Sequence, residues 1–226
     1  MHLINSICSI VGMRSYAFPE AMGDSDIKKM MQILDLELRK AVSEGMIVFR
    51  CGMSMGADIW SAKAVLNLRK VMPQIKLHCF LPCETQANQW SEQWREPYFQ
   101  ILAEADEVFC LQSHYTKGCF HRRNREMLSG SLRAILIYGT KADGGIAQAI
   151  DFCQSRGIET KIIKRSREEY IAKQPDDSIA LDPQYIDHTL DNEPIIKITD
   201  YISSQTSSAY LAGLDMGISA INSAWP

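Results

Sequence analysis

The sequence predicts an α/β fold, in which a doubly wound, mainly parallel sheet of about six strands carries helices on both faces and a C-terminal extension follows. Short apolar runs recur along the first 165 residues, and segments with helical periodicity separate them. The composition, 46% hydrophobic and 23% charged over 226 residues, is typical of a globular chain that buries one core without disulfides or a metal.

Each expected strand is a short apolar run. The strands are expected at residues 6–12, 46–51, 75–81, 106–111, 133–138 and 158–163. The first helix is capped by Asp24 or Ser25 and closed by Gly45, with apolar residues at i, i+3 and i+4 spacing. Further helices are expected at about 57–71, 89–105, 120–129 and 145–156. Right-handed crossovers between parallel strands place the ligand-binding loops at the C-terminal edge of such a sheet.

The chain divides into a ligand-binding domain, residues 1–165, and a segment of different character, residues 166–226. This second segment is charged, rich in Pro and Asp and poor in periodic apolar residues. It is interpreted as a linker and a C-terminal arm, with one possible short helix at about 207–221 that packs on the core or on a neighbouring subunit. We expect a homo-oligomer.

The net charge, the lack of long apolar runs and the cysteine spacing argue against several classes of partner. The net charge of −3 provides no field to hold a polyanion, which makes nucleic acid an unlikely partner. The sequence shows neither a signal peptide nor an apolar run that could span a bilayer, so a cytoplasmic protein without a membrane partner is expected. Seven cysteines without paired CxxC spacing indicate reduced, structural thiols, and no metal or cofactor is expected.

Polar and glycine residues follow the ends of the first two expected strands. Gly12 allows a sharp turn that leaves Arg14 available to clamp a phosphate, although Arg14 could also be a surface residue beside a turn. Gly52, Ser54 and Gly56 lie between the second strand and a helix, where backbone N–H groups and the helix dipole can bind an anion. Asp58 could cap this helix or touch the ligand.

Three further segments supply candidate residues. Glu84 and Gln86 follow the third strand and suit ribose hydroxyls or a base edge, whereas Trp90 and Trp94 are interpreted as packing residues. The stretch 113–125 is the most basic. In it Arg122 and Arg125 share a helix face while Arg123 is expected to stay solvated, and the alternative is a solvated helix start. Gly144 and Gly145 open another helix at the same edge, so two such turns and Arg14 could grip two phosphates, or a phosphate and a sugar.

Six fragments, in order, resemble the YpsA-like branch of the SLOG superfamily over about residues 5–164. They are GMR, CGMSMGADIW, LPCETQANQW, Asp106, YTKGCFHRRNREM and YGTKADGG. The resemblance implies a Rossmann-like domain that senses or processes a nucleotide-derived ligand. The superfamily also contains the LOG phosphoribohydrolases and the DNA-processing protein A family, so membership leaves a binder, an enzyme and a DNA-binding protein open.

The LOG enzymes carry a PGGxGTxxE motif whose glutamate assists cleavage of the N-glycosidic bond. The matching stretch here, residues 143–149, lacks both the threonine and the glutamate. Glu84 or Asp58 could replace the missing carboxylate, because a carboxylate near a ribose stabilises positive charge at C1′.

The leading hypothesis is the binding or sensing of a phosphate-bearing nucleotide-derived molecule, such as a mononucleotide, ADP-ribose or a dinucleotide. The alternatives are hydrolysis of a nucleotide N-glycosidic bond and binding of single-stranded DNA through residues 117–125. The sequence leaves open whether the ligand is turned over. The expected ligand-binding residues are Gly12, Arg14, Gly52, Ser54, Gly56, Glu84, Tyr115, Arg122, Asn124, Gly144 and Gly145.

Overall fold

The fold is described from a computed structural model that covers residues 6–14, 24–139, 142, 144–164 and 196–197. Its strands are β1 (Ser6–Gly12), β2 (Met46–Cys51), β3 (Lys76–Leu81), β4 (Glu107–Cys110), β5 (Arg133–Tyr138), β6 (Glu159–Lys164) and β7 (Ile196–Lys197). Its helices are α1 (Asp24–Ser43), α2 (Ala57–Arg69), the 3-10 helix η2 (Glu84–Ala87), α3 (Glu92–Glu104), α4 (Cys119–Leu128) and α5 (Gly144–Arg156).

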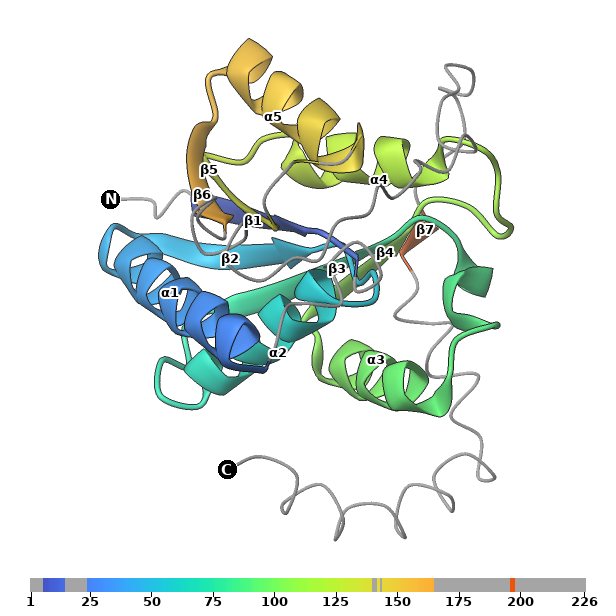
Figure 1. Cartoon of the computed structure of the whole chain (residues 1–226), viewed down its shortest axis with the longest axis horizontal. Coiled ribbons are helices and arrows are strands. Elements are labelled where there is room, and N and C mark those ends of the chain that lie inside the picture. The colour runs from blue at the N-terminus through green and yellow to red at the C-terminus, as the bar shows by residue number, and fades with distance from the viewer. Residues whose placement is uncertain (1–5, 15–23, 140–141, 143, 165–195, 198–226) are drawn as a thin grey trace, which may run out of the picture.

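The seven strands form one sheet in the order β6-β5-β1-β2-β3-β4-β7. All pairs among β1 to β6 are parallel, and β7 alone pairs antiparallel, along β4. Helices α1, α2 and α3 cover one face while α4 and α5 cover the other (Figure 1). The predicted doubly wound α/β fold with six parallel strands is therefore confirmed.

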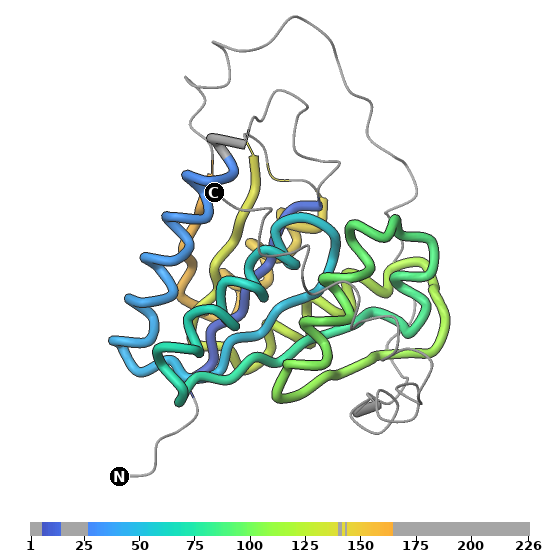
Figure 2. The backbone as a smooth tube through the Cα atoms, turned by 90° about the horizontal axis from the view of Figure 1, so that it is seen from below, coloured from blue at the N-terminus to red at the C-terminus, as the bar shows by residue number. Residues whose placement is uncertain are grey.

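The strand order creates one switch point in the sheet. The chain passes from β1 through β4 in one direction, and then returns so that β5 pairs with the other side of β1. Seen from below, after a 90° turn, α1, α2 and α3 lie side by side across their face of the sheet (Figure 2). In open sheets of this kind, ligands bind where the order reverses, outside the C-terminal ends of the strands. Here that place lies between β1 and β5.

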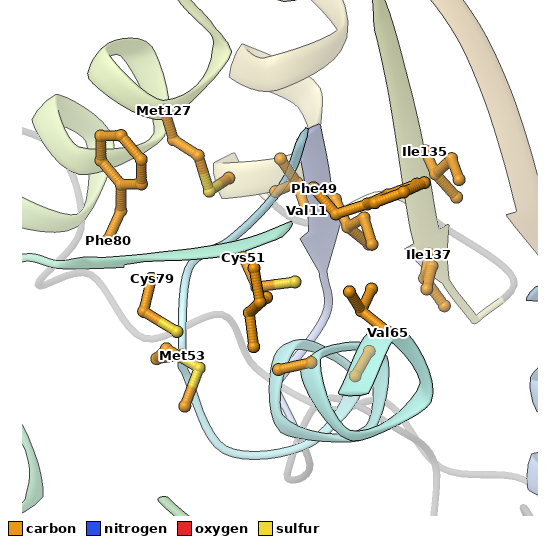
Figure 3. Packing of buried hydrophobic residues seen from close by; sticks show 14 of the residues in the cluster. Val11, Phe49, Cys51, Met53, Val65, Cys79, Phe80, Met127, Ile135 and Ile137 are labelled. Atoms are coloured by element: carbon orange, nitrogen blue, oxygen red, sulfur yellow. The ribbon is translucent and has the colours of Figure 1, made fainter. Parts of the chain in front are cut away.

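The core occupies both faces of the sheet and contains several sulfur-bearing residues. Cys51, Cys79 and Met53 lie on the α2 side, whereas Phe80 and Met127 pack together under α4 (Figure 3). All seven cysteines, each within the described part of the chain, are buried free thiols. Burial raises the pKa of Cys8 to about 12, so this thiol behaves as a small hydrophobic group.

The secondary structure differs from the sequence-based expectation at two places. The helix expected at 89–105 begins only at Glu92, as α3, and a separate 3-10 helix, η2, precedes it where no helix is expected. The ring centres of Trp94 and Trp60 lie 6.1 Å apart, and those of Trp90 and Tyr98 lie 5.2 Å apart. The tryptophans are packing residues, as expected. The second difference is β7, which lies within the segment that the sequence analysis interprets as a linker and arm.

The other structural expectations for residues 166–226, including the helix at 207–221, lie outside the described residues, and the domain boundary stays a prediction. Within the described part of the chain, no helix is both long and apolar enough to cross a membrane.

Candidate functional site

The first βα turn brings β1 close to the start of α2. A Cβ atom on Gly12 would lie 2.4 Å from the Cβ of Ala57, so this position accepts only glycine without a shift of backbone. The N–H of Ala57 donates to the carbonyl of Met13 at 3.2 Å, and Arg14 forms an antiparallel bridge with Gly56. The backbone of Arg14 is thus fixed at the C-terminal edge of the sheet.

The second turn, residues 52–56, follows β2 and leads into α2. Met53 and Gly56 have positive φ angles of 60° and 97°, which give the turn its shape. A Cβ atom on Gly52 would lie 1.6 Å from Nη1 of Arg123, which reaches over from α4. The side-chain amide of Gln86 donates to the carbonyl of Met53 at 2.5 Å and braces the turn from η2.

Asp58 accepts hydrogen bonds from two backbone N–H groups, and the sequence analysis assigns one of them, that of Ser54, to a bound anion. Its carboxylate accepts hydrogen bonds from the backbone N–H of Gly12 at 2.7 Å and of Ser54 at 3.1 Å. The residue is only 1% exposed, and burial raises its pKa while Arg123 and these N–H groups lower it. An internal carboxylate therefore occupies this junction of β1 and the second turn.

The expectation that Arg123 stays solvated is wrong. Arg123 is 3% exposed; its Nη1 lies 3.4 Å from Oδ2 of Asp58, and its Nη2 donates to Oγ of Ser54 at 3.0 Å. The missing side chain of Gly52 provides the space, and the buried carboxylate provides the charge partner. Burial lowers the pKa of Arg123, Asp58 raises it and the nearby Arg14 lowers it.

The ring of Phe120 contacts Arg14, Arg123 and Tyr115 at this edge of the sheet. The sequence analysis does not name Phe120 as a site residue. The Cζ atoms of Arg14 and Arg123 lie 4.2 and 5.8 Å from the centre of its ring. The ring of Tyr115 lies 6.4 Å away at an angle of 51°. In a sequence, a phenylalanine at the start of a helix is normally interpreted as a core residue. Only the geometry shows that its ring makes a cation–π contact with the Arg14 guanidinium.

The N-terminus of α5 is the other group at the switch point. Gly144 is its first residue and is exposed, and a Cβ atom there would meet nothing within 4 Å. Gly145 follows and is half-buried. The strand before α5 is β5, which neighbours β1, and the N–H of Met13 donates to the carbonyl of Ile137 at 2.8 Å. Arg14 and the start of α5 therefore both follow strands at the switch point.

The remaining expected residues differ in how deeply they are buried. Glu84 opens η2 and is half-buried, and its N–H donates to the carbonyl of Gln112 at 3.1 Å. Arg122 is 8% exposed. The Oδ1 atom of Asn124 is buried and accepts no hydrogen bond from the residues that the structure describes.

The structure thus connects Gly12, Arg14, Gly52, Ser54, Gly56 and Asp58 directly, and it links Tyr115 to them through Phe120. Over the described residues, no three His, Cys, Asp or Glu side chains gather as a metal site would require.

Comparisons with known proteins agree with this architecture. Residues 8–165 match the family model for YpsA, described as the YspA SLOG family. A UPF0398 protein from Bacillus pumilus is 28% identical over 120 residues, which cover 50% of this chain and 64% of that protein, so the match spans less than two thirds of the relative. A UPF0398 protein from Halalkalibacterium halodurans is 26% identical over 168 residues, covering 71% of this chain and 87% of that protein.

Proposed function

Because this chain belongs to the YpsA family of SLOG proteins, we propose that it binds a phosphate-bearing, nucleotide-derived small molecule at the C-terminal edge of its sheet. The phosphate lies between the guanidinium of Arg14 and the N-terminus of α5, where Gly144 and Gly145 begin the helix. A guanidinium donates two parallel hydrogen bonds to phosphate oxygens, and a helix N-terminus adds N–H groups and a partial positive charge.

The observation that carries the proposal is the position of Arg14. Its backbone is fixed by the bridge to Gly56, and its guanidinium lies 4.2 Å from the centre of the Phe120 ring. A preorganised side chain loses less conformational entropy when it binds a ligand. The proposal assigns the phosphate to Arg14 because Arg14 follows β1 at the switch point, whereas the side chain of Arg123 is buried against Asp58 and Ser54.

The proposal gives the second turn a supporting role. The N–H groups of Gly12 and Ser54 donate to Asp58, so they stabilise the turn. Gly12 and Gly52 allow close packing against Ala57 and Arg123. These residues form the floor of the proposed site, while Arg14 and the α5 N-terminus contact the phosphate.

Crystals grown with AMP or ADP-ribose test this placement. We expect a phosphate within hydrogen-bonding distance of the Arg14 guanidinium and the first N–H groups of α5. A nucleotide bound only at a different edge of the sheet, or none with either compound, would contradict the proposal.

The geometry gives less support to N-glycosidic hydrolysis. Of the two candidate carboxylates, Asp58 is buried and engaged with Arg123, Gly12 and Ser54, so the hydrolase alternative depends on Glu84. Incubation of the protein with AMP, followed by chromatography, measures turnover directly. Release of free adenine that is lost in Glu84→Gln would favour the enzyme over the binding protein.

A further inference from the structure

Tyr115 is an exposed aromatic residue on a loop whose backbone is fixed by hydrogen bonds from a buried side chain. Its relative exposure is 54%, whereas Gln112 in the same loop is 6% exposed. The side-chain amide of Gln112 donates to the carbonyl of His114 at 2.6 Å and to Oγ1 of Thr116 at 2.7 Å. One buried amide therefore fixes the chain on both sides of the tyrosine.

Further backbone contacts tie this loop to its neighbours. The carbonyl of Gln112 accepts from the N–H of Glu84 at 3.1 Å, which joins the loop to η2. The N–H of Cys119 donates to the carbonyl of Thr116 at 3.2 Å, and Gly118, with φ of 86°, makes the turn into α4. The aromatic ring of Tyr115 is therefore exposed to solvent, while buried polar groups hold the backbone of its loop in place.

Tyr115 shares a neighbour with the proposed phosphate-binding arginine. The ring centre of Phe120 lies 6.4 Å from that of Tyr115 and 4.2 Å from Cζ of Arg14. Resting on the proposed function, we infer that Tyr115 is the residue on which the base of the ligand stacks. The ligand class is then a nucleotide with an intact aromatic base, rather than a sugar phosphate.

Stacking explains why a fixed loop carries an exposed aromatic residue at this edge. Every nucleobase has a π face, and an aromatic side chain recognises it with little dependence on hydrogen-bonding pattern. Replacement of a stacking residue by alanine weakens binding by roughly 5- to 150-fold for each base. A tyrosine-to-phenylalanine change preserves the ring and serves as the conservative control.

Calorimetric titration of the full chain with AMP and with ribose 5-phosphate tests the inference. We expect AMP to bind roughly 5- to 150-fold more tightly than ribose 5-phosphate. Tyr115→Ala should reduce AMP affinity to that of ribose 5-phosphate without changing the latter, while Tyr115→Phe keeps the difference. Leu132→Ala, at a residue 55% exposed on the short connection before β5, is the matched control and should bind like the wild type.

The outcomes separate this inference from the function on which it rests. Equal affinities for the two compounds, or a difference that survives in Tyr115→Ala, would overturn base stacking at Tyr115 and leave phosphate binding intact. Failure of both compounds to bind would overturn both. A single-stranded adenine oligonucleotide that binds more tightly than AMP, with the same loss in Tyr115→Ala, would overturn the assignment to a free nucleotide.

Discussion

Asp58 and Arg123 lie 65 residues apart in the sequence and form an ion pair in which both side chains are less than 5% exposed. The pair connects the start of α2 on one face of the sheet with α4 on the other. Asp58 also accepts a hydrogen bond from the N–H of Gly12, and Arg123 donates one to the hydroxyl of Ser54. The architecture of the proposed site therefore depends on one buried pair.

Asp58→Ala should strongly destabilise the fold, because it leaves the guanidinium of Arg123 buried without its charge partner. Loss of one member of a buried pair costs about 3–5 kcal/mol of unfolding free energy. Asp35 and Arg39 form an exposed pair at 2.7 Å, and Asp35→Ala should leave the free energy of unfolding almost unchanged, because solvent screens the pair. Urea denaturation measures both, and equal small losses would show that the buried pair does not hold the site.

Gly52→Ala should also destabilise the protein, since its Cβ atom would lie 1.6 Å from Nη1 of Arg123. Overpacking of this kind costs about 1–3 kcal/mol. Gly144→Ala is the matched control, because a Cβ atom there meets nothing within 4 Å. Comparable thermal unfolding curves for the two variants would contradict the close approach of Arg123 to the second turn.

Phe120→Leu should weaken AMP binding by roughly 2- to 30-fold, because Arg14 loses a cation–π contact worth about 0.5–2 kcal/mol. Phe152→Leu is the control, since Phe152 carries Arg156 at 5.6 Å on α5 and lies outside the proposed site. Calorimetric titration of the two variants measures the difference. If both bind AMP like the wild type, Phe120 does not position Arg14.

Cys83 differs from the other buried thiols in its acidity. A hydrogen bond from the thiol of Cys119 lowers the pKa of Cys83, and the hydrogen bonds from Thr85 act in the same direction against burial. Ultraviolet absorbance of the thiolate should therefore titrate below the ordinary value of 9, and Cys83→Ser should remove that transition. A midpoint near the ordinary value of 9 would contradict the hydrogen-bonded thiolate.

The same shift predicts how stability depends on pH. Because the folded-state pKa of Cys83 is below its unfolded value, its contribution to stability is fully present above pH 9 and is lost as the pH falls below that value. The free energy of unfolding of the wild type should therefore fall more steeply below pH 9 than that of Cys83→Ser. Parallel pH profiles for the two proteins would contradict this linkage.

The sequence predicts the parallel strands and most helices because each is a local pattern of apolar residues. The two-residue β7 forms no such pattern, since it depends on pairing with β4 far along the chain. The candidate site divides in the same way. Arg14 and Gly144 are recognisable from their place after strands, but the burial of Arg123 depends on the space above Gly52, which only the folded chain creates.

The pairing of Asp58 with Arg123 shows how far the sequence alone can predict the role of a carboxylate. A carboxylate in the first turn of α2, after a turn with two glycines, can cap the helix, touch ligand or pair with a distant base, and spacing does not distinguish these. A buried carboxylate needs a positive partner, and the basic stretch beginning α4 offers three. The choice of Arg123 among them comes from the direction of the α4 side chains.

Calorimetric titration of the wild type, Arg14→Ala and Arg14→Lys with AMP tests the phosphate-binding role of Arg14 most directly. Arg39→Ala, an exposed arginine on α1, serves as the control. We expect Arg14→Ala to lose about 1.5–3 kcal/mol of binding free energy, a roughly 10- to 100-fold weaker affinity, and Arg14→Lys to bind more weakly than the wild type because it lacks the fork. All variants should unfold like the wild type. Equal AMP affinity in the wild type, Arg14→Ala and Arg14→Lys would contradict the account.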